Sequence, residues 1–185
     1  MPAGSDPAAR PGGFAEVDWS RWEPTERAVL CFVRDGDRVL LIHKKTGLGA
    51  GKVNAPGGRI DPGETAEEAA IREVREEVCV EASGLTKAGE LSFQFVDGYA
   101  LHGTVFFAAS HSGTPRETRE ADPFWCPIDA IPYERMWEDD RHWLPLALEG
   151  KPFRAFFVFD GDRMLSRRIH LSSGSGLPST LYGEP

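Results

Sequence analysis

The sequence predicts an α+β fold in which a mixed β-sheet lies between α-helices. Strand-like segments are joined in pairs by Asp-Gly turn signals, and two separate segments have helical character. Strands and helices mixed in this way favour a layered sandwich, because the apolar face of each element must be covered by another layer. At 185 residues and 41% hydrophobic content, the chain suits one domain with a proper core.

Composition sets the expected domain boundaries. Residues 1–26 are rich in Pro, Ala, Gly and charge, which predicts a disordered or loosely packed arm. Trp19 and Trp22 within that arm nevertheless need something to cover them. We expect the domain itself over residues 27–171, followed by a flexible tail rich in Ser, Gly and Pro over residues 172–185.

The first elements are a hairpin, a loop and a helix. Residues 27–33 and 38–43 read as strands around an Asp-Gly turn, and residues 44–58 read as a glycine-rich loop. A capping box of Thr65 and Glu68 predicts the start of the helix. Its expected apolar stripe is Ala66, Ala70, Val74 and Val78.

The second half of the chain contains more strands and one helix. A second helix is expected over residues 138–148, between strand-like segments that include two further hairpins with Asp-Gly turns. The strands are expected over residues 91–96, 101–109, 124–128, 153–159 and 164–171.

The net charge limits the classes of partner. A charge of −8 and a pI near 5.2 argue against binding of polymeric nucleic acid or anionic membranes. A small anionic substrate remains compatible, because a bound metal and a few local cations reverse the potential inside a cleft.

Cysteine usage and the first residues indicate the compartment. Cys31, Cys79 and Cys126 are widely scattered and lack C-x-x-C spacing, which predicts buried thiols in a reducing compartment. The chain begins without a basic and apolar leader, and no later segment reaches membrane-spanning length. We therefore expect a soluble, cytoplasmic protein, and a monomer rather than a dimer.

The most informative segment, residues 58–80, is a glycine turn followed by a helix with clustered carboxylates. Glu73 lies one helical turn from both Glu76 and Glu77, so the three side chains share one face. Like charges at this spacing destabilise a bare helix by a few tenths of a kcal/mol per pair. A divalent cation would remove that repulsion, and oxygen ligands suit Mg²⁺, with Mn²⁺ as the alternative. The competing interpretation is a solvated acidic face balanced by neighbouring arginines.

This turn and helix resemble the Nudix box, the signature of hydrolases that cleave nucleoside diphosphates linked to another group. Cys79 stands where the pattern has a glycine that ends the helix in a left-handed conformation, so some local strain is expected. The matching positions are Gly58, Glu64, Arg72, Glu73, Val74, Glu76, Glu77 and Val80.

The resemblance to the box implies a fold, a metal site and catalytic residues. It implies the Nudix fold, with metal held by Glu73, Glu76 and Glu77 together with the Gly58 carbonyl. Glu120 lies outside the box, at a position where one branch of the family places a further acidic group at the metal. Arg72 is expected to orient the glutamates by ion pairing, and Glu64 to brace the loop.

Outside the box, over about residues 27–169, the chain is similar to the oxidised purine nucleoside triphosphate hydrolases (8-oxo-dGTP diphosphatases). The implied reaction is hydrolysis of substrates such as 8-oxo-dGTP to the monophosphate and pyrophosphate, which sanitises the nucleotide pool. The segments that carry the likeness are 44–45, 47–51, 93–96, 113–115, 136–140, 143–146 and 156–159.

The same likeness implies a purine pocket. An amide such as Asn54 offers both a donor and an acceptor, and adjacent buried carboxylates seldom both ionise, so Asp139 and Asp140 would recognise a carbonyl and an N–H together. Trp137 and Phe93 would stack on the ring. The alternative for residues 137–140 is an acidic helix start with the tryptophan in the core.

Three lysines lie near the expected entrance, Lys44, Lys45 and Lys52, as solvated charges or as contacts to phosphate, and Lys44 is our candidate for substrate binding. Leu48 stands where the similar proteins have an aromatic residue, which implies a wider or shifted purine pocket.

Two other functions stay open. One is a Nudix pyrophosphohydrolase acting on another nucleoside diphosphate derivative, such as a methylated purine triphosphate, a dinucleoside polyphosphate or a nucleotide sugar. The other is a non-catalytic nucleotide-sensing module. Such modules usually lose glutamates of the box, whereas all of them are present in this chain.

Overall fold

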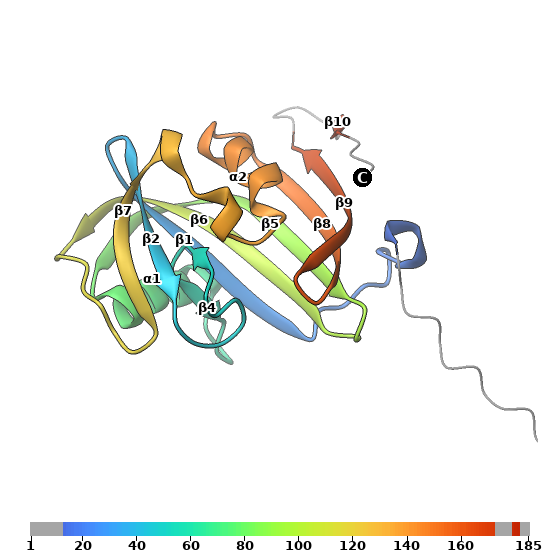
Figure 1. The fold of residues 1–185 in the computed structure, drawn as a ribbon, viewed down its shortest axis with the longest axis horizontal. Coiled ribbons are helices and arrows are strands. Elements are labelled where there is room, and N and C mark those ends of the chain that lie inside the picture. The colour runs from blue at the N-terminus through green and yellow to red at the C-terminus, as the bar shows by residue number, and fades with distance from the viewer. Residues whose placement is uncertain (1–12, 173–178, 182–185) are drawn as a thin grey trace, which may run out of the picture.

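The structure, a computed structural model, describes residues 13–172 and 179–181. A twisted sheet runs across the molecule between two helices, α1 (Ala66–Val78) and α2 (Asp140–Leu148) (Figure 1). Each helix packs into a separate apolar cluster. The predicted α+β fold, with a sheet between helices, is confirmed.

The sheet is mixed, as predicted. β1 is parallel to β6 and β5 is parallel to β8, while the other pairs are antiparallel. The strand order is β10-β9-β8-β5-β6-β1-β2-β3, with β4 paired to β1 and β7 paired to β2. The strands are β1 (Glu26–Asp35), β2 (Arg38–Lys44), β3 (Val53–Asn54), β4 (Gly57–Arg59), β5 (Glu81–Phe95), β6 (Ala100–Ser112), β7 (Ala121–Pro127), β8 (Phe153–Asp160), β9 (Arg163–Leu171) and β10 (Ser179–Leu181).

The central strands are buried on both faces. In β1, Phe32 belongs to the cluster around α2, whereas its neighbours Cys31 and Val33 belong to the cluster around α1. In β2, Leu41 belongs to the cluster around α2 and its neighbour Leu40 belongs to the cluster around α1. Successive side chains of a strand point to opposite faces, so a continuous apolar run supplies both cores.

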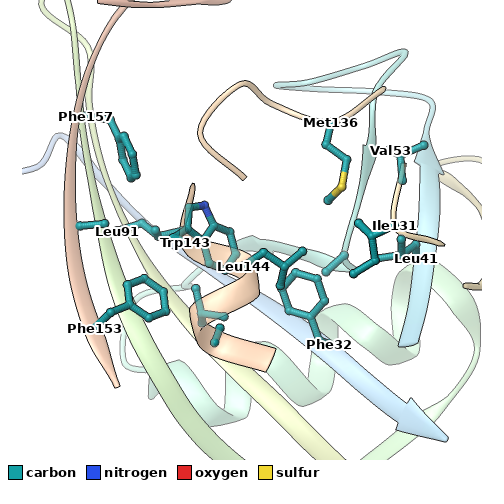
Figure 2. Packing of buried hydrophobic residues seen from close by; sticks show 14 of the residues in the cluster. Phe32, Leu41, Val53, Leu91, Ile131, Met136, Trp143, Leu144, Phe153 and Phe157 are labelled. Carbon is teal, nitrogen blue, oxygen red and sulfur yellow. The ribbon is translucent and has the colours of Figure 1, made fainter. Parts of the chain in front are cut away.

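Helix α2 anchors the larger core. Trp143 and Leu144 project from it among Phe153, Leu91 and Phe32, as Figure 2 shows. The Trp143 ring is fully buried and stacks on Phe153, with the ring centroids 5.5 Å apart. This packing fixes the start of α2, and therefore the residues just before it, against the sheet.

Helix α1 begins and ends as the sequence indicates. The Thr65 hydroxyl accepts from the Glu68 amide and the Glu68 carboxylate accepts from the Thr65 amide, so the capping box is present. The helix ends at Cys79, which adopts the left-handed conformation with φ of 62°. The side chain of Cys79 is exposed, so the expectation that all three cysteines are buried is wrong at this position.

Several element boundaries differ from the prediction. The expected loop over residues 44–58 contains β3 and β4, because Gly57 pairs closely with β1. A Cβ on Gly57 would lie 2.1 Å from the Val29 carbonyl oxygen. β5 begins at Glu81 rather than residue 91, and its first half is mostly polar and exposed, which hides the strand pattern. β7 begins at Ala121 rather than at residue 124, and α2 begins at Asp140 rather than at residue 138.

The described part of the expected arm lies against the sheet. Trp19 packs edge-on against Phe156 of β8, and the Trp22 Nε1 donates to the side-chain Oε1 of Gln94 at 2.9 Å. Residues 1–12 of the arm, and residues 173–178 and 182–185 of the expected tail, lie outside the described residues. No helix in the described ranges is long and apolar enough to cross a membrane.

We predict that Cys79→Gly stabilises the protein. A non-glycine residue in the left-handed region costs about 1–2 kcal/mol, and the entropy that glycine adds to the unfolded chain offsets about 0.4–1 kcal/mol of this gain. The free energy of unfolding from urea titration should therefore rise by about 0.5–1 kcal/mol. Cys79→Ala keeps the Cβ and serves as the control. A glycine variant no more stable than the alanine variant would contradict the strain.

Candidate active site

One cavity of about 510 Å³ brings together nearly all of the side chains singled out from the sequence. Its walls come from the sheet, from the inner face of α1 and from the segments that precede β3 and α2. Arg72 and Glu76 are not among its lining residues. The expected site residues that do line it are Lys44, Asn54, Gly58, Glu73, Glu77, Phe93, Glu120, Trp137, Asp139 and Asp140.

Glu77 places a buried carboxylate in the cavity wall, among the lining residues Gly58, Glu73, Glu77 and Glu120, which we call the glutamate end. Its residue exposure is 1%, and burial raises the pKa of its carboxyl group. Two donors compensate this cost, the Lys44 Nζ at 3.0 Å and the Gly57 backbone amide at 3.0 Å. The carboxylate therefore joins α1 to β2 and β4.

Glu73 lies against the glycine turn. A Cβ on Gly58 would be 2.5 Å from the Glu73 carboxylate, so only glycine allows this approach. The Glu73 side chain is 13% exposed, and burial raises the pKa of its carboxyl group although the Arg72 guanidinium counteracts this. The carboxylate and the Gly58 backbone thus line the same small region.

Arg72 fastens α1 to the glycine turn. Its Nε and Nη2 donate to the two oxygens of Glu64 at 2.7 and 2.8 Å, and its Nη2 also donates to the Arg59 carbonyl oxygen at 3.0 Å. Its Nη1 donates to Glu73 at 2.8 Å and to Glu76 at 3.1 Å. The guanidinium lowers the pKa of Glu64 to about 2. The guanidinium thus binds both Glu73, which lines the cavity, and Glu76, which does not line it and whose side chain is 58% exposed.

The donor chemistry at this end of the cavity fits a divalent cation. Within the described residues, no three Asp, Glu, His or Cys side chains already converge as a ligand set. The cavity is nevertheless lined by the carboxylates of Glu73, Glu77 and Glu120, and by Gly58, whose missing Cβ leaves room for the Glu73 carboxylate. Oxygen donors of this kind suit Mg²⁺ or Mn²⁺.

A second pair of carboxyl groups, those of Asp139 and Asp140, is buried in the cavity wall, and we call these two residues with Trp137 the aspartate end. Asp139 accepts from the Trp143 Nε1 at 2.9 Å, and Asp140 accepts from the Trp137 amide at 3.0 Å. The remaining oxygen of Asp139, Oδ1, is buried and has no hydrogen-bond partner among the described residues. Burial raises the pKa of Asp139 to about 7 and holds that of Asp140 well above its ordinary value. A protonated carboxyl group here offers a donor to a ligand.

The alternative interpretation of residues 137–140, an acidic helix start with the tryptophan in the core, is confirmed in part, because Asp140 begins α2 and Trp137 packs against the larger core cluster. Asp139 is the N-cap residue of α2, but its side chain makes no capping hydrogen bond. Trp137 lines the cavity and stands edge-on to Phe159, with ring centroids 5.8 Å apart. The segment therefore presents an aromatic ring and two carboxyl groups to the cavity.

The flat wall of the cavity comes from β5. Phe93 lines the cavity and stacks on Phe157, with ring centroids 5.3 Å apart. Leu91 and Phe95 line it too, and their i, i+2 spacing from Phe93 is a signal that could have identified them. Asn54 also lines the cavity, and its side-chain amide oxygen accepts from the Ala55 backbone amide at 2.8 Å.

Sequence reasoning missed one polar part of the cavity wall. The Tyr99 hydroxyl donates to Glu26 at 2.6 Å, and Glu26 pairs with Arg59 at 2.9 Å. All three residues line the cavity. They lie far apart in the chain and match no motif, so no local signal could have grouped them.

Each of the three entrance lysines has a protein partner. Lys44 pairs with Glu77, and Lys45 pairs with Glu117 and donates to the Thr118 carbonyl oxygen at 2.8 Å. Lys52 pairs with Asp162 at 3.0 Å. The interpretation of these three lysines as freely solvated charges is therefore wrong, because each one pairs with an acidic side chain.

Comparison with known proteins agrees with the geometry. Residues 24–147 match the NUDIX domain family. The chain is 43% identical over 139 residues to the oxidized purine nucleoside triphosphate hydrolase of Mus musculus, covering 74% of this chain and 89% of that protein. It is also 43% identical over 133 residues to the Danio rerio protein of the same name, covering 71% of this chain and 85% of that protein. The MutT protein of Bacillus halodurans shares its fold with a TM-score of 0.70 and 26% identity, covering 78% of this chain and 97% of that chain.

We predict that Asp139→Asn changes how stability depends on pH. The raised pKa of Asp139 means that the folded wild type holds a proton which the unfolded chain releases near pH 4. The stability that this proton gives is present below pH 4 and is lost as the pH rises through about 7. Urea titration measures the free energy of unfolding of both proteins at pH 5 and at pH 8. From pH 5 to pH 8, this free energy should fall more for the wild type than for the variant, which lacks the titrating group. The same difference at both pH values would contradict a raised pKa.

Proposed function

Because the chain belongs to the NUDIX family, we propose that it is a pyrophosphohydrolase that cleaves oxidised purine nucleoside triphosphates, such as 8-oxo-dGTP, to the monophosphate and pyrophosphate. One observation carries this proposal: a single cavity is lined both by Glu73 and the buried Glu77 and by a tryptophan with two buried aspartates. The mouse and zebrafish relatives, which are named for this activity, support the same substrate class.

The aspartate end suits an oxidised purine. An oxidised guanine edge has both carbonyl oxygens and N–H groups, so it needs acceptors and donors together. Asp139 and Asp140 supply both when one of them keeps its proton, as their raised pKa values favour. The Asn54 amide adds a donor, and Trp137 and Phe93 offer faces for stacking.

The glutamate end suits the phosphate chain. Glu73 and Glu77, with the Gly58 carbonyl, would hold a divalent cation, for which Mg²⁺ is our first choice and Mn²⁺ the alternative. When bound, such a cation polarises phosphate oxygens and lowers the pKa of a coordinated water. Glu120, which also lines the cavity, would accept a proton or complete the ligand set.

Two cations of the chain organise this end. Arg72 orients Glu73 from outside the cavity and would keep Glu76 as an outer partner of the site. Lys44 neutralises Glu77 and is near enough to the cavity to contact a phosphate oxygen. The substrate is thus a small nucleotide, and we propose a cytoplasmic monomer that binds neither polymeric nucleic acid nor membranes.

Glu77→Gln should lower kcat at least a hundredfold, because it removes a buried anionic donor while preserving side-chain shape. Steady-state assays with 8-oxo-dGTP and magnesium measure this loss, and circular dichroism checks that the fold is retained. Glu76→Gln should lose less, since the Glu76 carboxylate points away from the cavity.

Glu67→Gln is the matched control for these variants. Glu67 lies on the first turn of the same helix, is exposed, and does not line the cavity. Its replacement should leave kcat unchanged. Survival of turnover in Glu77→Gln at the level of this control would show that the glutamate end is not the reaction centre.

A nucleotide panel separates the proposal from other substrates of the family. With magnesium, kcat/KM should be at least roughly tenfold higher for 8-oxo-dGTP or 2-oxo-dATP than for dGTP or ADP-ribose, because unsatisfied polar groups in the base pocket discriminate by that much or more. The products should be the monophosphate and pyrophosphate, and EDTA should abolish turnover until magnesium is restored. A preference for ADP-ribose or another nucleotide sugar would favour the alternative substrate class.

A further inference from the structure

Lys52 lies beside the cavity without lining it. Its Nζ is 4.9 Å from the centroid of the Trp137 ring and 3.0 Å from Asp162 Oδ2 in the turn between β8 and β9. Trp137 itself lines the cavity. Lys52 therefore touches a wall residue of the site and connects it to a hairpin turn outside the site.

The loop that precedes Lys52 is fitted against the same indole ring. A Cβ on Gly49 would lie 2.8 Å from the Trp137 Nε1, and Gly49 has a φ of 81°, which favours glycine. Backbone hydrogen bonds close this loop, from the Lys52 amide to the Gly49 carbonyl oxygen at 2.9 Å and from the Lys44 amide to the Lys52 carbonyl oxygen at 2.9 Å. The loop backbone and the Lys52 side chain thus both fix the position of the Trp137 ring.

The position of the indole ring matters for the aspartates. The backbone amide of Trp137 donates to Asp140, so the ring and the carboxyl group belong to one short segment. The positive charge of Lys52 also opposes the effect of burial, which is the larger cause, on the pKa of Asp140. A cation at this point influences both the aromatic face and the acidic edge of the base pocket.

We propose that Lys52 is a positioning residue for base recognition, held by Asp162 and acting through the Trp137 ring. This inference rests on the proposed function, because it assumes that Trp137 contacts the base of the nucleotide. Lys52 does not touch the substrate, so its replacement should weaken binding of the base while leaving the phosphate chemistry intact. The turn between β8 and β9 thereby contributes to substrate affinity from outside the cavity.

The test compares Lys52→Met, which keeps the aliphatic stem but removes the charge, with Lys52→Arg, which keeps a cation that stacks on aromatic faces. Loss of a cation–π contact predicts a rise of roughly fivefold in the KM for 8-oxo-dGTP, with kcat within about twofold of wild type. The arginine variant should restore the wild-type KM. Asp162→Asn should raise KM by about twofold, because it removes only an ion pair in which the Asp162 side chain is exposed.

Calorimetric binding of two metal-free probes, 8-oxo-dGMP and the nucleoside 8-oxo-deoxyguanosine, separates the base from the phosphates. Lys52→Met should weaken both probes by the same factor if the lysine acts through Trp137. A loss seen with the monophosphate but not with the nucleoside would mean that Lys52 contacts phosphate, and would overturn the inference. Unchanged binding of both probes, or failure of arginine to rescue, would overturn it as well.

Lys151→Met is the matched control. Lys151 is an exposed lysine paired with Glu149 after α2, so its replacement removes the same charge from an ion pair that does not border the cavity. It should leave KM and probe binding unchanged. Failure of the proposed function is recognised separately, by a wild type that binds both probes but hydrolyses no triphosphate. If the wild type binds neither probe, the cavity is not a base pocket, and both the proposed function and this inference are wrong.

Discussion

The buried carboxylate of Glu77 is the constraint on which the rest of the site depends. An ionised carboxyl group without partners is expensive inside a protein, so every element near it must help to compensate its charge. Lys44 at the end of β2 and the Gly57 amide in β4 do so directly, and Thr118 binds the backbone carbonyl of Glu77. Glu77 thus joins α1 to β2, β4 and the segment that contains Thr118. Its buried charge contributes little to the apolar core, but it would serve as an oxygen ligand at a phosphate-binding site.

The buried carboxyl groups of the glutamate end and of the aspartate end are stabilised in different ways. At the glutamate end, cations of the chain lie beside the buried carboxylates and keep them available as oxygen donors. At the aspartate end, burial raises the pKa of Asp139 so that a carboxyl group keeps its proton and becomes a donor itself. Both ends are fixed by the cores on either side of the sheet, since α1 carries the glutamates and Trp143 of α2 holds Asp139. A nucleotide that spans the cavity would meet both.

The sequence predicted what depends on local pattern. Short apolar runs, Asp-Gly turns and the capping box are read over a few positions, and the hairpins and α1 follow from them. The left-handed Cys79 was also foreseeable, because the helix must end there. Long-range contacts were not: the Lys44–Glu77 pair, the Lys52 contact with Trp137 and the outward turn of Glu76 depend on how distant segments meet. The exposed first half of β5 was missed because its residues are polar.

The central claim is that Glu73 and Glu77 hold a divalent cation at the glutamate end of the cavity. Direct titration with Mn²⁺, followed by electron paramagnetic resonance in the presence of 8-oxo-dGMP, tests it without relying on turnover. The wild type and Glu67→Gln should bind the ion with equal affinity, and Glu77→Gln should bind it at least about tenfold more weakly. Absence of Mn²⁺ binding in the wild type, or equal binding in all three proteins, would contradict the account.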